Sequence, residues 1–399
     1  MIEPEEAWRR IAAQVAPLPP VELPLTEPVG HVLAEEVVAE EDVPPFAAST
    51  VDGWAVVAAD DSPRRRVLEG EGTAGRMPSV RVTPGTAARV MTGAPLPAGA
   101  DAVVMVEDSE EEDGWVRFSR RVRPGDGVRP AGSDLAAGQV VLEPGTVLGP
   151  AEIGLLATVG RAAARVHPRP RVAVLSTGDE LVEPGERPGP GQIRDSNRYA
   201  LLAAIRQAGG EPVSLGMAPD DADGQRALIL RALEEADALV TSGGVSMGVR
   251  DLIGPLLAEL GTVHFRRVRQ KPGKPFTFAT VGGKPCFGLP GNPVSSLVTF
   301  ELYVRPALRR MAGHRLLQRP QVEARLRHPV RCDPVRVEFQ RAVVVQEEEA
   351  WWAQTTGSQA SSRLLSMTGA NGMLRLPPGP PLPAGSTVTA ILIQRPEDH

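Results

Sequence analysis

The chain has 399 residues, which exceeds a single small module and predicts roughly two to four domains. Hydrophobic residues make up 42% and charged residues 23%, and 41 Gly with 40 Pro stay below the level of low-complexity chains. A net charge of −6 argues against binding nucleic acid through overall charge.

The first 168 residues mix a helix with short strands. Residues 4–15 predict an amphipathic helix, and apolar residues continue at helical spacing over 25–33 until Pro44 and Pro45 interrupt the pattern. Short strands are expected at 80–82, 87–91, 102–106 and 115–118, with an acidic turn at 107–113. Residues 140–148 predict a strand, and Pro150 opens a helix to about residue 159.

After Pro168 strands and helices alternate. Strands are expected at 171–176, 212–216, 238–241 and 263–268, with helices at 197–208, 222–235, 251–260 and 293–311. This rhythm predicts a doubly wound α/β domain with a parallel sheet. Beyond residue 320, apolar alternation at 322–326, 335–339, 342–345 and 388–392 predicts a C-terminal β domain.

These patterns divide the chain into four parts. We expect an N-terminal helical and linking domain (1–45 with 135–168), a β-rich inserted domain (46–134), an α/β domain (169–317) and a C-terminal β domain (318–399). The apolar runs are far shorter than the ~20 residues that span a bilayer, and the acidic N-terminus has no signal-peptide core. We therefore expect a cytoplasmic protein without membrane or nucleic-acid partners.

Unusual motifs follow the predicted strands of the α/β domain, where ligands bind in open α/β sheets. The five motifs are Ser176-Thr-Gly-Asp-Glu180, Asp220-Asp221, Ser242-Gly-Gly-Val-Ser-Met-Gly248, Lys271-Pro-Gly-Lys274 and Pro290-Gly-Asn-Pro293. Gly243 and Gly244 would let backbone amides approach an anion, with Ser242 and Ser246 beside them. We expect the five loops to meet at one edge of the sheet.

Residues at several strand ends suit phosphate and metal chemistry. Asn292 is a candidate N-cap before Pro293, which would direct the amides of Ser295 and Ser296 into the crevice. The acids Glu180, Asp220 and Asp251 stand at three strand ends and suit Mg²⁺ held against phosphate oxygens. A turn acid at Glu180, and helix caps at Asp220 and Asp251, are the structural alternatives.

Lysine and asparagine are scarce. Of the 43 basic residues only Lys271, Lys274 and Lys284 are lysine, and the three asparagines are Asn197, Asn292 and Asn371. No acid lies between Glu259 and Glu301, where six basic residues gather, so we expect a small anionic ligand; a solvated basic face is the alternative. Cys286 and Cys332 form no disulfide or metal motif, and we expect buried, inert thiols.

Taken together, the motifs resemble one family along nearly the whole chain, the molybdopterin molybdenumtransferases, or MoeA and gephyrin E-domain family. The matching segments are 45–55, 91–97, 99–107, 176–181, 191–197, 242–251, 271–276 and 289–296. The resemblance implies an elongated homodimer whose α/β domain is similar to the molybdopterin adenylyltransferase fold. It also implies a Mg²⁺-dependent reaction that inserts molybdenum from molybdate into adenylylated molybdopterin and releases AMP.

The resemblance also implies residue roles. Asp52, Thr92 and Asp134 would come from the β-rich domain across the dimer interface, and Glu180, Asp220 and Asp251 would hold metal and phosphate. Arg267, Lys271, Lys274, Ser246, Arg336 and Ser358 would surround the oxyanion, beside a substrate site that includes Ser242, Gly243, Gly244, Pro290, Asn292, Pro293 and Ser295. Ser133 stands where the family has an acid, and Arg267 where a lysine is expected. The alternatives are an adenylyltransferase-type enzyme and a non-catalytic scaffold of the gephyrin type.

Overall fold

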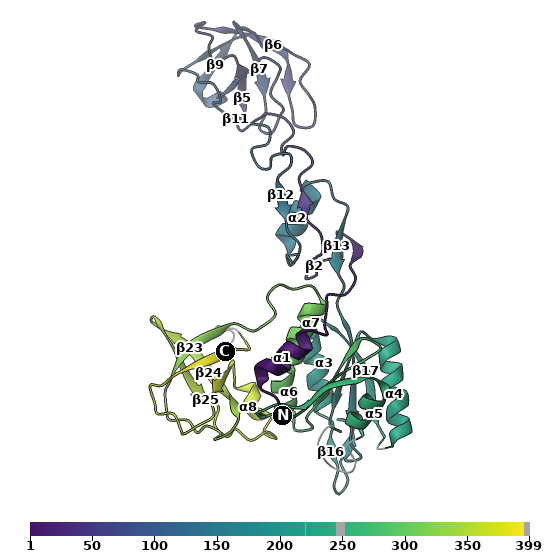
Figure 1. The fold of residues 1–399 in the computed structure, drawn as a ribbon. Coiled ribbons are helices and arrows are strands. Elements are labelled where there is room, and N and C mark those ends of the chain that lie inside the picture. The colour runs from purple at the N-terminus through teal and green to yellow at the C-terminus, as the bar shows by residue number, and fades with distance from the viewer. Residues whose placement is uncertain (220, 245–251, 395–399) are drawn as a thin grey trace.

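A computed structural model describes residues 1–219, 221–244 and 252–394 (Figure 1). The predicted site residues Asp220, Ser246 and Asp251 lie outside the described residues. The molecule is elongated, with a β-rich lobe at one end and the α/β sheet and C-terminal strands side by side at the other (Figure 1). A narrow linking region of short strands and one helix joins the two ends.

The N-terminal helix α1 (Pro4–Ala12) is confirmed. Proline stands in its first turn, acids follow there, and arginines occupy its last turn, in line with the helix dipole. Its buried residues Ala7 and Ile11 pack into the core of the α/β domain.

The helical spacing over residues 25–33 was a wrong indication. The chain runs through β1 (Val21–Pro24) and β2 (Val32–Leu33) instead, both paired with β13 (Ala163–His167). Prolines at 19, 20, 24 and 28 remove the backbone donors that a helix needs. In the same linking region β3 (Val37–Val38) pairs with β12 (Val140–Leu142), and α2 (Pro150–Thr158) begins at Pro150 as predicted.

The β-rich lobe is built on a six-stranded sheet in the order β8-β5-β7-β6-β10-β9. Its strands are β5 (Gly53–Val56), β6 (Arg65–Gly72), β7 (Thr86–Val90), β8 (Ala102–Met105), β9 (Ser109–Glu112) and β10 (Trp115–Phe118). β4 (Ala48–Ser49) and β11 (Val128–Arg129) form a separate pair. The side chain of Trp54 is buried in the lobe's core.

Two expectations for this lobe are corrected. Residues 80–82 form no strand, and Arg81 makes only an isolated bridge to Ala98. The acidic segment 107–113 is not one turn: a 3-10 turn, η1 (Val106–Asp108), leads into the exposed edge strand β9. Asp113 and Gly114 then form the two-residue hairpin turn, with φ of 50° and 78°. Positive φ at both positions is typical of the turn that matches strand twist.

The α/β sheet has the order β17-β14-β18-β22-β21-β19. Its four parallel strands are β17 (Glu211–Ala218), β14 (Arg171–Thr177), β18 (Ala238–Ser242) and β22 (Lys284–Leu289). The first three confirm predicted strands, whereas β22 was not predicted from the sequence. β21 (Pro275–Val281) runs antiparallel to β22, and a hairpin turn at Gly282 and Gly283 joins the two strands. β21 also runs antiparallel to β19 (Thr262–Arg267) on its other side. The sheet is therefore mixed at this edge, which the alternation of strands and helices did not indicate.

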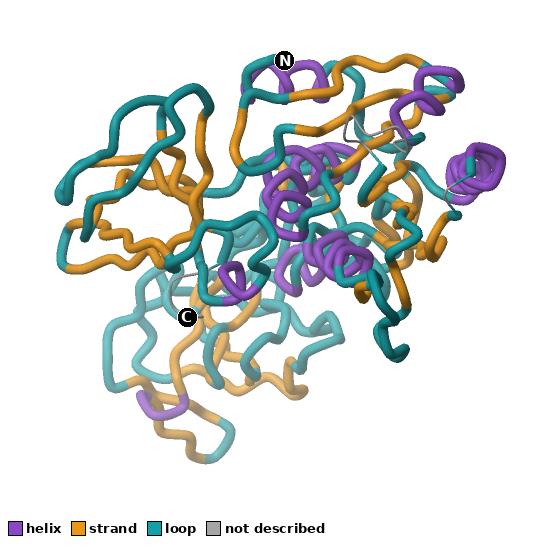
Figure 2. The backbone as a smooth tube through the Cα atoms, turned by 90° about the horizontal axis from the view of Figure 1, so that it is seen from below, coloured by secondary structure: helices purple, strands orange, loops and turns teal. Residues whose placement is uncertain are grey.

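Alternate residues of the central strands face two helical layers. Val174 on β14 packs with Leu201 and Ile205 of α3 (Asn197–Gln207). Leu175 packs on the other side with α4 (Ala222–Glu235) and α5 (Ile253–Leu260). Figure 2 shows a group of helices between the strands of this sheet and those of the C-terminal domain.

The predicted helix over 293–311 is one helical run with a widened middle. It consists of α6 (Pro293–Thr299), a π-helical segment η2 (Phe300–Val304) and α7 (Arg305–Met311). Pro306 lacks an N–H and its ring conflicts with the carbonyl four residues before it, and the wider turn relieves both problems.

The C-terminal domain is a closed β-barrel. Its strands are β23 (Gln321–Leu326), β24 (Val337–Glu347), β25 (Ala350–Thr355), β26 (Gly372–Leu376) and β27 (Thr387–Leu392). The barrel closes because β24 pairs with both β25 and β26, which leaves no free edge among them. The two strands expected at 335–339 and 342–345 are this one strand β24. A short helix α8 (Leu365–Thr368) lies between β25 and β26.

Candidate functional site

A cleft of about 1040 Å³ lies at the carboxyl ends of β14, β18 and β22. It is lined by residues 177–181, 242–244 and 290–293, and by the segment 190–197 that leads into α3. Three of the five predicted loops therefore meet here. Parallel strands end at the same edge of a sheet, so loops that are distant in sequence become neighbours.

Asn197 ties two of these loops together. It begins α3, and its Nδ2 donates hydrogen bonds to Ser242 Oγ (2.8 Å) and to the Gly291 carbonyl (2.7 Å). Sequence reasoning did not assign Asn197 to the site, although a chain with three asparagines contained the signal. The other two asparagines also join separate segments. Asn292 bonds Ser361 in the loop before α8, which we call the barrel loop, and Asn371 bonds both the N–H and the carbonyl of Val344 inside the barrel.

The loop after β18 needs its glycines. Gly243 and Gly244 have φ of 88° and 65°. A Cβ on Gly243 would lie 2.7 Å from the Thr177 carbonyl oxygen, and one on Gly244 would lie 2.8 Å from the Ile253 side chain. Only glycine lets this loop approach β14 and α5 so closely.

The start of α6 differs from the expectation. Asn292 is at the N-cap position and Pro293 follows in the first turn, but the Asn292 side chain does not cap the helix. Its Nδ2 donates to Ser361 Oγ (3.0 Å), and the Val294 N–H donates to the Ser361 carbonyl (3.0 Å). The Ser296 amide is not directed into the crevice either, because it bonds the Asn292 carbonyl (2.9 Å) inside the helix. Of the predicted site residues, Pro290 and Ser295 line the cleft, and Ser362 of the barrel domain also lines it.

One predicted acid faces the cleft. Glu180 is exposed there, and its carboxylate folds over Gly178, where a Cβ would lie 2.5 Å from Oε2. Asp195 also lines the cleft but is buried, with Oδ2 paired to Arg198 Nε at 3.0 Å. Arg198, in the first turn of α3, also binds Glu183, which follows β15 (Leu181–Val182), and this bond lowers the pKa of the Glu183 carboxyl.

The predicted metal site is only partly described. Asp221, the neighbour of Asp220, accepts a hydrogen bond from the Gly224 amide (2.7 Å) and caps α4. Within the described part of the chain, no three His, Cys, Asp or Glu residues form a metal-binding group. Glu180 is the described member of the predicted set, and its exposed carboxylate at the cleft suits a cation that is shared with phosphate oxygens.

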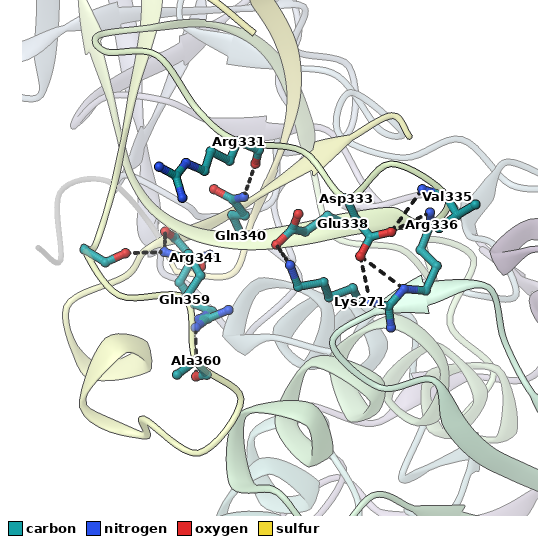
Figure 3. A network of polar contacts seen from close by, with 11 residues as sticks. Lys271, Arg331, Asp333, Val335, Arg336, Glu338, Gln340, Arg341, Gln359 and Ala360 are labelled. Atoms are coloured by element: carbon teal, nitrogen blue, oxygen red, sulfur yellow. Dashed lines mark hydrogen bonds and ion pairs between the residues drawn. The ribbon is translucent and has the colours of Figure 1, made fainter. Parts of the chain in front are cut away.

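A second pocket of about 430 Å³ lies between the barrel and Lys271. Lys271 Nζ lies 3.0 Å from Glu338 Oε1, because β20 (Gln270–Lys271) pairs in parallel with the start of β24 (Figure 3). The Glu338 carboxylate is buried, while the lysine side chain remains partly exposed. Cys332 lines this pocket as a half-buried thiol, so only Cys286 is fully buried as expected.

Arg336 is held beside the same pocket. Its guanidinium lies 2.6 Å from Asp333 Oδ2, and Asp333 lines the pocket (Figure 3). The hydrogen bond from Arg336 lowers the pKa of Asp333 to about 2, although burial of the carboxyl opposes this. The backbone amides of Val335 and Arg336 also bond this carboxylate.

The other predicted oxyanion residues stand around the two cavities. Lys274 is exposed on the turn between them, since Lys271 lines the pocket and Pro275 lines the cleft. Arg267 is half-buried at the end of β19, opposite Pro275. Ser358 is exposed between Gly357 and Gln359, both of which line the pocket.

Arg341 holds the loop that carries Ser358. This buried arginine donates to the Ala360 carbonyl (3.2 Å) and to Ser366 Oγ (3.1 Å), and its amide donates to Gln359 Oε1 (2.8 Å) (Figure 3). Burial lowers the pKa of Arg341 to about 10. The sequence reasoning did not include Arg341, because a basic residue within a strand pattern gives no sign of burial.

The remaining predicted residues do not reach the cleft within one chain. The backbone N–H and Oγ1 of Thr92 donate to Asp52 Oδ1 at 2.7 and 2.8 Å, and these bonds lower the pKa of Asp52. Asp134 pairs with Arg129 where the lobe joins the linking region. The lobe lies at the opposite end of the molecule from the α/β sheet (Figure 1), whose strand ends form the cleft.

The chain was compared with known families, proteins and structures. Residues 2–160 match the MoeA N-terminal region (domain I and II), 173–310 a probable molybdopterin binding domain, and 323–393 the MoeA C-terminal region (domain IV). Molybdopterin molybdenumtransferase 2 of Mycobacterium tuberculosis is 39% identical over 385 residues, which are 94% of this chain and 95% of that protein.

Two further comparisons agree. Dictyostelium discoideum gephyrin is 36% identical over 422 residues; the match covers 92% of this chain but 59% of gephyrin. The crystal structure of a molybdopterin biosynthesis MoeA protein from Pyrococcus horikosii superimposes with a TM-score of 0.87 at 35% identity, and the match covers 99% of this chain and 100% of that one. The chain therefore belongs to the MoeA family of molybdopterin molybdenumtransferases and is a transferase of molybdenum cofactor biosynthesis.

Proposed function

We propose that the chain inserts molybdenum from molybdate into adenylylated molybdopterin and releases AMP in a Mg²⁺-dependent step. The observation that carries this proposal is the pair of adjacent cavities. The cleft of about 1040 Å³ has room for a large nucleotide-bearing substrate, and the pocket of about 430 Å³ suits a small oxyanion. The segments 271–275 and 357–362 contribute to both cavities, so the two ligands would lie next to each other.

The cleft would hold the phosphates of the substrate. The glycine-rich loop at 242–244 and the hydroxyl of Ser295 line it, and such groups hydrogen bond to phosphate oxygens. Mg²⁺ would bind at Glu180, with Asp220 and Asp251 as the other candidate ligands. The ion would neutralise charge on the phosphate oxygens as the bond to AMP breaks.

The protein's own part in this reaction is positioning and charge neutralisation rather than covalent catalysis. Burial raises the pKa of Cys286 to about 12, so this thiol is not an available nucleophile. Among the described residues no histidine lines the cleft.

The smaller pocket would hold molybdate. Lys271 and Arg336 supply positive charge there, and the buried carboxylates of Glu338 and Asp333 fix the two cations in place. Cations that are already oriented lose little freedom when an anion binds. Lys274 and Ser358 are exposed next to residues that line this pocket, and they are the further contacts that we propose for the bound oxyanion.

We also propose a homodimer in which the β-rich lobe of one chain completes the cleft of the other. Thr92 orders Asp52 by two hydrogen bonds, yet the lobe that carries both residues lies at the opposite end of the molecule from the α/β domain. The linking region exposes the apolar side chains of Val21, Val29, Val140 and Val147, which contact with a second copy would bury.

The test is AMP release from adenylylated molybdopterin by the purified protein, with and without molybdate and Mg²⁺. We expect release to require Mg²⁺ and to fall at least about tenfold in Glu180→Gln at limiting Mg²⁺, since one ligand charge is lost. Glu234→Gln, which removes an exposed acid on α4, is the matched control and should behave as wild type. AMP release that does not depend on Mg²⁺, or equal AMP release by Glu180→Gln and Glu234→Gln at limiting Mg²⁺, contradicts the assignment of Glu180.

A further inference from the structure

The turn that carries Lys271 and Lys274 rests on a buried amide. Gln270 is fully buried, and its Nε2 donates to the Pro272 carbonyl inside the turn (3.1 Å). Its Oε1 accepts a hydrogen bond from the Tyr303 hydroxyl (2.5 Å). The amide nitrogen of Gln270 therefore fixes the turn, and Tyr303 fixes the amide oxygen of Gln270.

Tyr303 also contacts the other end of the turn. It lies in the π-helical segment η2, its side chain is only 2% exposed, and its ring stacks on Phe276 with 5.0 Å between the ring centroids. Burial raises the pKa of the Tyr303 phenol, so the hydroxyl keeps its proton and remains a donor. One side chain thus touches the residue before the turn and a residue just after it.

The turn is seated closely on the same helical run. Gly273 has a φ of 93°, and a Cβ there would lie 2.4 Å from Thr299 Oγ1 and 2.6 Å from Gln270 Nε2. Thr299 and Tyr303 are four residues apart and so lie on one face of the helical run. The turn therefore fits closely against this face of the helical run.

The two lysines differ in how they depend on this support. Lys271 is also held by the β20–β24 pairing and by Glu338. The Lys274 ammonium makes no hydrogen bond or ion pair with the rest of the described chain, so the backbone of the turn alone determines where it can reach.

We propose that Tyr303 is a positioning residue for oxyanion binding: its hydroxyl, acting through Gln270, sets the Lys271–Lys274 turn and hence the place of the Lys274 ammonium. The inference rests on the proposed function, which puts molybdate beside these lysines. Without the hydroxyl, the buried Gln270 oxygen loses its donor, the amide reorients, and the bond to Pro272 is lost.

The first test is Tyr303→Phe, which keeps the ring and its stacking on Phe276. We expect the KM for molybdate to rise about tenfold, as small misplacements of a binding group produce, while kcat and the KM for adenylylated molybdopterin stay within about twofold. Equilibrium dialysis of molybdate should show the same loss without turnover. A fall in kcat, or an equal rise of both KM values, would show a general structural role and overturn the proposal.

Two further variants make the test decisive. Gln270→Leu should raise the molybdate KM as Tyr303→Phe does, and the double variant should be no worse than either, because both act through one link. Phe300→Leu is the matched control: it alters a fully buried ring of the same segment that has no polar link to the turn. It should lower stability and leave the molybdate KM unchanged.

Lys274→Ala separates this proposal from the function on which it rests. If Lys274→Ala raises the molybdate KM and Tyr303→Phe does not, the positioning role fails and the oxyanion site stands. If Lys274→Ala leaves the molybdate KM unchanged, the oxyanion assignment itself fails.

Discussion

The three lysines of this arginine-rich chain have three different environments. Lys271 pairs with the buried Glu338, Lys274 is exposed between the two cavities, and Lys284 donates to the carbonyls of Leu233 and Ala236 at the end of α4. Lys284 therefore has a structural role, since a cation there satisfies free carbonyls and the helix dipole. Lysine scarcity alone does not mark a binding residue, and the two lysines of the turn have to be tested.

Lys274→Arg should raise the molybdate requirement for AMP release about tenfold, with little change in the binding of adenylylated molybdopterin. A guanidinium is bulkier than an ammonium and imposes a planar fork on a tetrahedral ligand. Lys284→Arg should keep the wild-type molybdate titration and lose at most about 1 kcal/mol of unfolding free energy. Identical molybdate titrations of the two variants would remove the lysine argument for the oxyanion site.

Asp333 should make stability depend on pH in acid. Its folded pKa of about 2, set mainly by Arg336, lies below the value of about 3.9 in the unfolded chain. The ionised carboxylate therefore stabilises the fold above about pH 4, and this contribution disappears as the pH falls through about 2. Urea unfolding of wild type and Asp333→Asn should differ by about 1–2 kcal/mol more at pH 6 than at pH 2.5. A difference that does not change with pH would contradict the ion pair.

At the scale of elements, the site depends on contacts between loops that follow different strands. Asn197, at the start of α3, joins the loop after β18 to the loop after β22. Asn292 and Ser361 join α6 to the barrel loop. Side-chain amides therefore hold together several of the segments that form the walls of the cleft.

Asn197→Ala should lower kcat/KM for adenylylated molybdopterin by about 10–100-fold, because the two loops lose their common donor. Unfolding free energy should fall by only about 1–2 kcal/mol. Asn371→Ala is the matched control, since its amide bonds Val344 inside the barrel and the residue lines neither the cleft nor the smaller pocket. It should cost about 2–3 kcal/mol of stability and leave the KM of the folded enzyme unchanged. Equal kinetic effects of the two changes would argue against a role for Asn197 in shaping the cleft.

At the scale of the whole molecule, the separation of the β-rich lobe from the cleft requires a second chain if both serve one reaction (Figure 1). Sedimentation equilibrium at micromolar concentration should therefore give the mass of a dimer. Asp52→Ala and Glu180→Ala should each be inactive alone, and mixed heterodimers should regain up to about half of the wild-type dimer's activity, because one of their two sites is intact. A monomeric mass, or no recovery in verified heterodimers, would exclude shared sites.

Local patterns were sufficient for much of the fold. The amphipathic pattern of residues 4–15 indicated α1, Pro150 indicated the start of α2, and the alternation after residue 168 indicated three of the four parallel strands, β14, β17 and β18, with their helices. These features are encoded locally, in side-chain period and chain-end signals. The hairpin β21–β22 was missed although Gly282-Gly283 is a turn signal, because its strands are buried and lack polar alternation.

The sequence by itself determined the family, through motifs along the whole chain, and the loops in which the cleft would form. Only the tertiary structure decided that the lysine turn lies between two cavities and that Tyr303 supports this turn through Gln270. It also decided that the Asn292 side chain bonds Ser361 instead of capping α6. The physical reason is that these contacts join residues 33 to 69 positions apart. Their geometry depends on how the sheet, the helical run and the barrel pack together, and no local pattern records that packing.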